Sequence, residues 1–509
     1  MEKSIKYWIW GKIKFHLFIP ALYCLLPTAS IAQIRFERTY GWSTNENGYS
    51  VQVTQDGGYI IAGLTDSLWA TGQRDVYLLR TDSLGDTLWT KIYGGAFSDY
   101  GVSVQNTQNG GFIIAGVTSS FGAGNYDAYL IKTNSSGDTL WTRAYGGLDV
   151  DWGTSVLVTQ DGGYIIAGRT LSFGAGSSDV YLIKTDTMGN LLWEKTFGGV
   201  DFDAENSFQL TQDGGFIIAG ATNSFGTGAL DVYLIKTDSM GNLLWEKTYG
   251  GAMNDAGSSV QVTQDGGFIL AGSSNSFGIY DVYLIKTNSS GDTLWTRTFG
   301  GASIDYGLSV QVTQDKGYIV TGETESFGAG GQDVYLIKTD SLGNSLWTRT
   351  YGGALNEYGL SVQLTQDGGY VIAGLTSSFG AGREDVYLIK SDSLGNIVGI
   401  EEENTNPIEK NRNKVFFLFQ NQPNPFHYLT AFRYQISLTH FTQEGMQGVP
   451  IRLVVYDITG RLVKTIVEKA QEPGIYQIEW DGRNHSSGVY FLCLSSDNFT
   501  QTRKMILLH

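Results

Sequence analysis

Residues 198–249 read GGVDFDAENSFQLTQDGGFIIAGATNSFGTGALDVYLIKTDSMGNLLWEKTY, and units of about this length recur along most of the chain. A Gln-Asp/Asn-Gly/Lys-Gly signature marks seven copies, which begin at Gln55, Gln108, Gln160, Gln212, Gln264, Gln314 and Gln366. The steps between these positions are 53, 52, 52, 52, 50 and 52 residues. Such a regular step predicts a closed or stacked repeat architecture.

Each unit contains four runs of strand length, which in this copy span 207–211, 216–220, 231–237 and 243–249. Val, Ile, Tyr, Phe and Thr dominate the runs, and Gly, Asn, Asp and Ser fill the gaps, as expected for strands and turns. The segments FIIAG and VYLIK are apolar at successive positions, so both of their faces must be covered. A blade between two neighbouring blades meets this requirement. No stretch has a sustained period of 3.6 residues, so no helix is expected.

The connections between the runs differ in length. Gln-Asp-Gly-Gly and Asp-Ser-Met-Gly-Asn form tight turns, whereas the SFGTG segment and the link between units are longer. In a propeller the two longer connections emerge on the same face. We therefore expect that face to carry the loops available for function.

The phase of the repeat predicts how the fold closes. Residues 34–41 (IRFERTYG) match the fourth run of a unit, whereas after residue 390 the last unit lacks its own fourth run. Pairing the two would close a ring and remove an open sheet edge. The sequence therefore predicts an all-β fold in which residues 33–400 form a seven-bladed β-propeller closed by an N-terminal strand. A β-solenoid is the alternative.

The N-terminus has the pattern of a secretory signal peptide over residues 1–32. Lysines precede an apolar run at 15–27, and small residues at 30–32 mark a cleavage site. The alternative, a membrane anchor, is disfavoured because the apolar run is short and contains Pro20 and Pro27, so no transmembrane helix is expected in the mature chain. The segment carries four lysines and one glutamate, so its removal changes the net charge from −16 to −19. An acidic chain without a basic stripe argues against nucleic acid as a partner.

The composition changes after a linker predicted at 401–413. Residues 414–509 contain strand-like runs at 431–438, 451–457, 475–480, 489–494 and 505–508, which suggests a small β-sandwich.

Ordered motifs in this region carry a family resemblance. They are FQNQPNPF (419–426), VYDITGR (455–461), WDGR (480–483), SGVYF (487–491) and TRKM (502–505). The region resembles the C-terminal sorting domain of the bacterial type IX secretion system, an Ig-like module related to those of flagellar hook-capping proteins. The resemblance implies the type IX machinery as a partner, and secretion or display at the outer-membrane surface. It implies nothing about what the propeller does.

The repeats also loosely resemble those of quinoprotein propellers, in which a Gly precedes a docking Trp by four residues. The pairs here are Gly85/Trp89, Gly137/Trp141, Gly189/Trp193, Gly241/Trp245, Gly291/Trp295 and Gly343/Trp347. The aspartate of the family pattern is displaced by one position and no cofactor-site constellation is recognisable. The resemblance therefore implies the fold and not quinone chemistry.

The repeat region has no histidine and no cysteine. This excludes Ser-His-Asp and Cys-His catalysis there, and the usual nitrogen and sulfur ligation of zinc. Carboxylates remain, in two repeated series. One begins the third run of every unit (Asp75, Asp127, Asp179, Asp231, Asp281, Asp333, Asp385) and is expected to satisfy loop N–H groups.

The second acidic series is Glu46, Asp99, Asp151, Asp203, Asp255, Asp305 and Glu357. These residues are expected just before the innermost strand, on the long-loop face, where they would ring the mouth of the central channel. Three interpretations remain open: capping of loop turns in water, a bound cation such as calcium, or a catalytic carboxylate pair. Calcium is the only possible cofactor that the sequence suggests.

Residues that depart from the repeat are candidates for an asymmetric ligand site. On the long-loop face these are Trp69, Arg74, Trp152, Tyr280 and Arg383. Aromatic platforms with polar neighbours suit glycan or protein ligands. We therefore expect a secreted or surface-displayed binding protein that is not an enzyme. The alternatives are an extracellular carbohydrate-active enzyme that uses loop-face carboxylates, and a structural surface-layer component.

Overall fold

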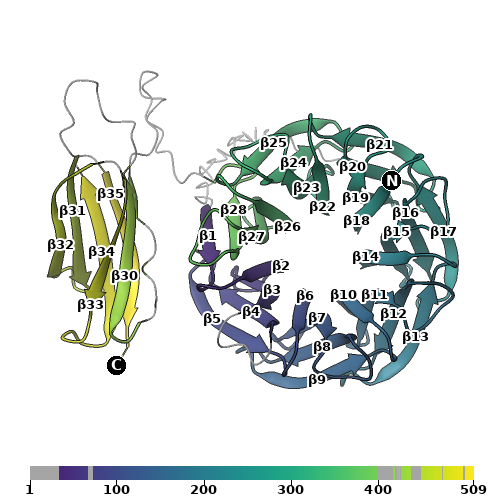
Figure 1. Ribbon diagram of the computed structural model, residues 1–509, viewed down its shortest axis with the longest axis horizontal. Helices are drawn as coiled ribbons and strands as arrows, with labels where there is room; N and C mark the ends of the chain where they lie inside the picture. Colours follow the sequence, from purple (N-terminus) through teal and green to yellow (C-terminus); the bar gives the residue numbers. More distant parts are fainter. Residues whose placement is uncertain are drawn as a thin grey trace, which may run out of the picture. The chain divides into compact units, whose positions relative to one another are not determined.

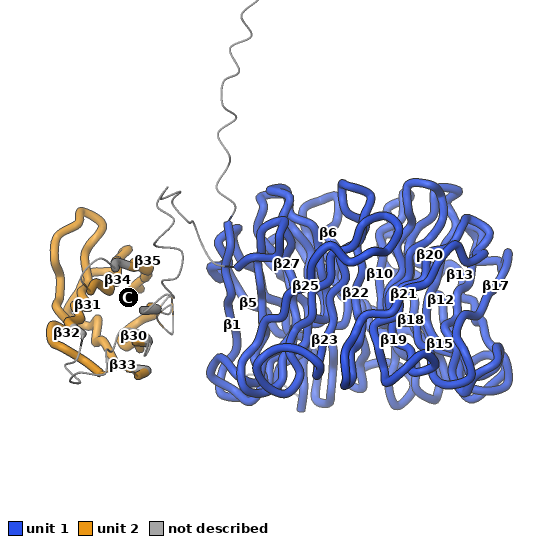
Figure 2. Tube along the Cα trace, turned by 90° about the horizontal axis from the view of Figure 1, so that it is seen from above, with its two compact units in different colours: residues 1–400 blue, residues 401–509 orange. Residues whose placement is uncertain are grey.

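The structure, a computed structural model, describes residues 34–66, 73–397, 416–418, 421, 424, 426–436, 449–472, 474–496 and 499–508. The chain divides into two compact units, residues 1–400 and 401–509, which Figure 2 shows in different colours. The described residues form strands, turns and loops, without a helix. It follows that they offer no long apolar helix that could cross a membrane. The predicted signal peptide and linker lie outside the described residues.

The first unit contains seven four-stranded antiparallel sheets, numbered here 1 to 7 in chain order. Their first strands are β2 (Glu46–Val53), β6 (Asp99–Asn106), β10 (Asp151–Val158), β14 (Asp203–Leu210), β18 (Asp255–Val262), β22 (Asp305–Val312) and β26 (Glu357–Leu364). Their second strands are β3 (Tyr59–Thr65), β7 (Phe112–Thr118), β11 (Tyr164–Thr170), β15 (Phe216–Thr222), β19 (Phe268–Ser274), β23 (Tyr318–Thr324) and β27 (Tyr370–Thr376). Their third strands are β4 (Asp75–Thr81), β8 (Asp127–Thr133), β12 (Asp179–Thr185), β16 (Asp231–Thr237), β20 (Asp281–Thr287), β24 (Asp333–Thr339) and β28 (Asp385–Ser391). Their fourth strands are β5 (Thr87–Tyr93), β9 (Thr139–Tyr145), β13 (Leu191–Phe197), β17 (Leu243–Tyr249), β21 (Thr293–Phe299), β25 (Ser345–Tyr351) and, in sheet 7, β1 (Phe36–Tyr40).

Figure 1 shows these sheets arranged around a common centre, with the first strands innermost and the fourth strands outermost. The arrangement is propeller-like, and the prediction of an all-β repeat fold is confirmed. The two longer connections of each unit lie at the same end of the sheets, because they bond to one another. In sheet 2, for example, Phe97 N donates to Ser120 Oγ at 2.9 Å.

The innermost strand is longer than predicted. In the unit at 198–249 it spans Asp203–Leu210, whereas the sequence pattern indicated only 207–211. Its register shifts between Glu205 and Ser207, where one extra residue interrupts the pairing with β15. Such a bulge breaks the alternation of inward and outward side chains, so the pattern does not show the first half of the strand.

Both faces of the middle strands are buried, as predicted. In β15, Ile217 and Ala219 pack against sheet 5, whereas Phe216 and Ile218 pack against sheet 3. All seven residues of this strand are buried. Burial of each such large apolar side chain stabilises the fold by about 1.5–3 kcal/mol. Each sheet therefore depends on two neighbours.

The N-terminal strand completes sheet 7. β1 pairs with β28 in antiparallel register, from Phe36 opposite Lys390 to Tyr40 opposite Val386. Val386 and Leu388 in turn pack with Val51 and Ile61 of sheet 1, so the last sheet contacts the first.

The contacts of β1 reproduce those of the other fourth strands. Tyr40 Oη donates to Gly85 O of sheet 1 at 2.6 Å, and Tyr93 Oη donates to Gly137 O of sheet 2 at the same distance. Trp89 covers Gly137, and Phe36 takes the corresponding position over Gly85. The segment before the first repeat thus acts as the fourth strand of the last one.

The second unit contains two sheets, with strand orders β29-β30-β33 and β32-β31-β34-β35. The strands are β29 (Phe416–Leu418), β30 (Leu429–Ile436), β31 (Val449–Asp457), β32 (Leu462–Gln471), β33 (Gly474–Asp481), β34 (Gly488–Ser496) and β35 (Phe499–Leu507). One hydrophobic core joins the sheets, with Phe432 and Trp480 from the first and Leu453, Leu492 and Met505 from the second.

The sequence missed two of these strands. Strand β29 has only three residues, which is too short for a pattern. Strand β32 is mostly exposed, and its charged and apolar residues do not alternate regularly.

The role of β1 is testable by deletion of residues 34–41 from the chain. The deletion exposes the edge of β28 and removes the packing of Phe36 and Tyr40, so we expect a lower unfolding midpoint and self-association. Thermal unfolding and light scattering measure the two effects. As a control, Tyr40→Phe removes only the bond to Gly85 O and should lower the stability by about 1 kcal/mol. A monomeric deletion variant with an unchanged midpoint would contradict this role.

Candidate functional site

The acidic series expected before the innermost strands consists instead of the first residues of those strands. All seven carboxylate side chains are fully buried: Glu46, Asp99, Asp151, Asp203, Asp255, Asp305 and Glu357. The predicted position just outside the strand is therefore wrong. The reason is the same bulged first half of the strand that the sequence pattern concealed.

Each of these carboxylates accepts a hydrogen bond from a backbone N–H group of the connection that leads into its own strand. Asp203 Oδ2 accepts from Gly199 N at 2.7 Å and from Ser224 Oγ at 2.6 Å. Asp255 repeats this arrangement with Gly251 N at 2.8 Å and Ser276 Oγ at 2.6 Å. An unpaired N–H group buried at this place would cost about 1–3 kcal/mol, so every sheet needs such an acceptor.

The two acidic series meet in pairs at the sheet boundaries. Asp179 of sheet 3 and Asp203 of sheet 4 both border Gly198, where a Cβ would clash with the two carboxylates. Burial, and to a lesser extent Asp203, raise the pKa of Asp179. Within the described ranges, no three His, Cys, Asp or Glu side chains form a group that could hold a metal ion. Calcium binding by the innermost series stays a prediction.

The other acidic series satisfies loop N–H groups, as predicted. Asp179 Oδ2 accepts from Ala175 N at 2.9 Å and from Gly176 N at 3.1 Å. Asp231 has equivalent contacts with Thr227 N at 2.9 Å and Gly228 N at 2.8 Å. Asp127, Asp333 and Asp385 make equivalent bonds, so these carboxylates hold the longer loop in sheets 2, 3, 4, 6 and 7.

Aligning the seven units column by column identifies three charged residues that the sequence analysis missed. Glu205 occupies the third position of the innermost strand, where the other sheets have glycine. Arg169 and Glu323 occupy the sixth position of the second strand in sheets 3 and 6. The other sheets have Leu64, Val117, Ala221, Ser273 and Leu375 there.

Glu205 is a buried acid at the boundary between sheets 3 and 4. Its side chain is 1% exposed, Thr154 Oγ1 donates to its Oε2, and its Oε1 has no partner among the described residues. Burial raises the pKa of Glu205 to about 8. The residue is therefore largely protonated at neutral pH.

Glu323 lies among aromatic and acidic side chains at the long-connection end. It pairs across the strands with Tyr306, whose ring is 5.4 Å from that of Tyr280. Burial and the neighbouring Glu325 raise the pKa of Glu323 to about 7. A hollow of about 320 Å³ adjoins this group and is lined by Ser303, Glu325, Gly330, Gly331, Gln332 and Asn356.

Arg169 lies against two aromatic rings. It is opposite Trp152 in the pairing of β10 with β11, and its guanidinium carbon is 4.3 Å from the centroid of the Trp152 ring. The same carbon is 5.8 Å from the ring of Phe202, which precedes the innermost strand of sheet 4. Both Arg169 and Trp152 are half-buried.

The predicted ligand residues do not form one cluster. Trp69 lies outside the described residues. Arg74 is exposed and donates to Tyr100 Oη at 3.4 Å, Trp152 contacts Arg169, and Tyr280 contacts Tyr306. Arg383 is exposed in the connection that precedes β28. The residues are thus spread over several sheet boundaries. Trp152 contacts the charged residue Arg169, and Tyr280 contacts Tyr306, which pairs with Glu323.

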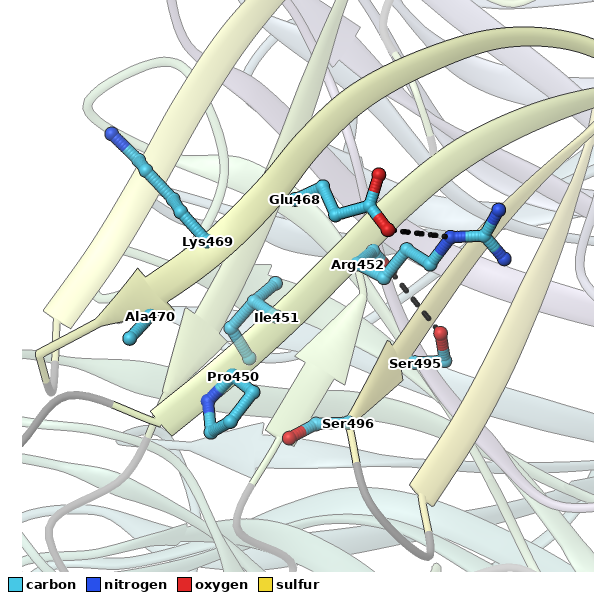
Figure 3. A pocket seen from close by; sticks show the side chains of 8 residues that line it. All are labelled: Pro450, Ile451, Arg452, Glu468, Lys469, Ala470, Ser495 and Ser496. Carbon is cyan, nitrogen blue, oxygen red and sulfur yellow. Dashed lines mark hydrogen bonds and ion pairs between the residues drawn. The ribbon is translucent and has the colours of Figure 1, made fainter.

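The second unit contains a shallow hollow of about 420 Å³ at one end of β31, β32 and β34 (Figure 3). Arg452 Nε lies 3.6 Å from Glu468 Oε1, and Ser495 Oγ donates to Arg452 O at 3.4 Å. The hollow contains none of the residues predicted for a site.

Residues 423–508 match the secretion system C-terminal sorting domain, so the resemblance stated from the motifs is confirmed. A domain of this family implies export by the type IX secretion system to the cell surface or the extracellular space. The chain is also 28% identical over 227 residues to the regulatory protein FlaEY of Caulobacter vibrioides, a match that covers 38% of this chain and 24% of that protein. The chain thus spans about a quarter of this relative.

Several solved structures are similar to the chain. PorZ of Porphyromonas gingivalis, described as an essential surface component of the type IX secretion system, is 12% identical with a TM-score of 0.39, covering 91% of this chain and 59% of that one. Puromycin hydrolase is 12% identical with a TM-score of 0.46, covering 80% and 61%. Polysaccharide lyase Uly1 is 11% identical with a TM-score of 0.42, covering 70% and 91%. These low scores carry no argument about activity.

The buried acid of sheet 4 predicts a pH dependence. Glu205 ionises near its ordinary pKa of 4.5 when the chain is unfolded and near 8 when it is folded. Between these values the folded state binds the extra proton, so this residue lowers the stability as the pH rises. Glu205→Gln removes the titration. We therefore expect the free energy of unfolding of the variant, relative to that of the wild type, to increase by about 1 kcal/mol or more as the pH rises from 5 to 8.

Urea unfolding at several pH values measures this difference. Glu479→Gln, at an exposed glutamate of β33, serves as the control and should not reproduce it. A constant difference between Glu205→Gln and the wild type across this range would contradict the assignment.

Proposed function

We propose that the chain is a secreted or cell-surface binding protein without catalytic activity. In this proposal the seven sheets form a closed seven-bladed β-propeller that presents a ligand site at its long-connection end. An Ig-like sorting domain follows, and residues 1–32 act as the signal peptide. The match of residues 423–508 to the sorting-domain family supports the delivery step.

One observation carries the binding role: charged side chains replace apolar or small ones in particular columns of an otherwise regular repeat. Arg169 and Glu323 occupy a column that holds leucine in sheets 1 and 7. Buried or half-buried charges without a partner lower stability, so folding alone does not explain them. Function resides in such local departures from a fold and not in the fold itself.

The environment of these residues suits a glycan or a polar protein segment. Tyr280, Tyr306 and Trp152 provide aromatic surfaces, and the hollow beside Glu325 is lined by hydroxyl, amide and carboxylate groups. Ligand sites combine apolar surface with a few placed polar groups in this way. Calcium remains a candidate cofactor, because oxygen ligands suit it.

A glycan array probed with the full mature chain tests this proposal, in calcium and in a chelator. We expect binding by the wild type and loss of binding by the double variant Arg169→Leu/Glu323→Leu, which lacks both charged groups. The double variant should still fold, because leucine occupies this column in sheets 1 and 7. The matched control is Met188→Ala, which changes an exposed side chain on a short turn of sheet 3. Unchanged binding by the double variant, or no binding to any glycan, would overturn the proposal for glycans. An effect of the chelator would support a calcium site.

A second candidate function is glycoside cleavage, which one observation favours. Glu325 lines the polar hollow, Glu323 lies two residues before it in the chain, and the pKa of Glu323 is raised to about 7 by burial and by Glu325. A protonated and an ionised carboxyl group are the pair that such hydrolysis uses.

Release of reducing ends from a panel of polysaccharides tests this candidate. If it holds, the wild type releases sugar and Glu323→Gln reduces the rate at least about 100-fold, as expected for loss of a general acid. The control Met188→Ala should retain the full rate. Absence of release by the wild type rules the candidate out for the substrates tested.

A further inference from the structure

Two N–H groups at the boundary of sheets 3 and 4 have no acceptor. Arg169 Nε and Trp152 Nε1 are both buried atoms without a hydrogen-bond partner in the described part of the chain. They belong to side chains that pack together, with the guanidinium carbon 4.3 Å from the centre of the indole ring. Buried donors are normally paired, so two unpaired donors in one contact require an explanation.

The charge of Arg169 is also uncompensated. Lys184, in the same sheet, forms an ion pair with Asp161 at 2.9 Å, whereas Arg169 forms none with the residues that the structure describes. Burial lowers the pKa of Arg169, and no neighbouring carboxylate offsets this effect. A partly desolvated cation without a counter-ion is unfavourable for folding.

A ligand that accepts hydrogen bonds from the two unpaired donors and compensates the charge of Arg169 must supply an anionic oxygen. The face of the guanidinium is against the Trp152 ring, so its edge makes any hydrogen bonds. Because Nε on this edge and Nε1 of Trp152 are buried, a ligand oxygen reaches them only when the side chains that cover them move aside. Nε–H together with a terminal N–H matches the two oxygens of a carboxylate in a planar, bidentate contact. The indole N–H of Trp152 can donate a further bond, since it is a donor only.

A single negative charge is enough to compensate Arg169. Exposed Asp149 lies three residues before Trp152 in the sequence, and exposed Asp201 directly precedes Phe202. Neither carboxylate forms an ion pair with Arg169 among the described residues, and their negative charge disfavours a polyanion or a dianion more than a monoanion. In sheet 4 the positions equivalent to Trp152 and Arg169 hold the small residues Ala204 and Ala221, so sheet 4 has no counterpart of this pair.

We propose that Arg169 and Trp152 form a binding site for a ligand bearing one carboxylate, with Arg169 as its counter-ion. This inference rests on the proposed binding function and specifies its chemistry. The carboxylate has two possible small-molecule sources, a sugar acid or the end of an amino-acid chain, and both present the same group to the site.

Fluorine NMR of the full mature chain labelled with 5-fluorotryptophan tests the site. The Trp152 signal is assigned as the one missing in Trp152→Phe. The probes are sodium glucuronate for a sugar acid and sodium N-acetylalaninate for a chain end, with glucuronamide and N-acetylalanine amide as neutral controls. We expect a saturable shift of the Trp152 signal with one or both carboxylates and none with the amides. The stronger carboxylate identifies the source.

Two variants make the result specific. Arg169→Leu should weaken binding more than tenfold, while its unfolding midpoint stays equal to or above that of the wild type, because leucine occupies this column in sheets 1 and 7. Arg169→Lys keeps the charge but cannot make the bidentate contact, and we expect about tenfold weaker binding. Binding that is equal for carboxylate and amide, or unchanged in Arg169→Leu, overturns the inference, as does sulfate binding as tightly as the carboxylates.

The outcomes also separate this inference from the function on which it rests. Glycan-array binding by a chain whose Trp152 signal does not respond to carboxylates rejects the carboxylate site and leaves the binding function standing. A responding Trp152 signal in a chain that binds nothing on the array supports the site and rejects the glycan ligand.

Discussion

The burial of both faces of the middle strands is the constraint on which the first unit depends. Ile217 and Ile218, adjacent in β15, pack against opposite neighbouring sheets. A sheet of this kind cannot be the last one in an open stack without exposing an apolar face. Contact between sheet 7 and sheet 1 removes that exposed face, and β1 completes the hydrogen bonding of β28. The N-terminal strand therefore completes sheet 7 and adds to its packing against sheet 1.

The repeated carboxylates follow from a second requirement, the satisfaction of buried backbone donors. At every sheet boundary a backbone N–H group of the connection between the two sheets donates to a buried Asp or Glu. A residue that is needed at each boundary must recur in each unit. Repetition of an acid around the ring therefore has an adequate structural explanation, and the innermost series by itself identifies no site.

The departures from the repeat have no such explanation, which is why they indicate function. Arg169 and Glu323 are charged at a column where other sheets have leucine, valine, alanine or serine. Each leaves a buried polar atom without a partner, as do four of the seven innermost acids, but no requirement shared by all sheets accounts for a charge in this column. Glu205 replaces a glycine, and burial raises the pKa of its carboxyl group to about 8. Comparing the columns of the repeat would have found all three residues. The residues predicted from the loops include only two that lie near them: Trp152, which contacts Arg169, and Tyr280, which contacts the Tyr306 opposite Glu323.

The sequence by itself determined the number of repeats, their four-strand content and the N-terminal strand that pairs with β28. These features depend on local hydrophobic periodicity and on the phase of the repeat, which a linear pattern contains. The sorting domain was likewise recognisable from ordered motifs. Only the tertiary structure decided that the innermost acids are buried and that Arg169 lies on Trp152 without a counter-ion. Burial and pairing depend on neighbouring sheets, so residues that are equivalent in the sequence repeat become different in their surroundings.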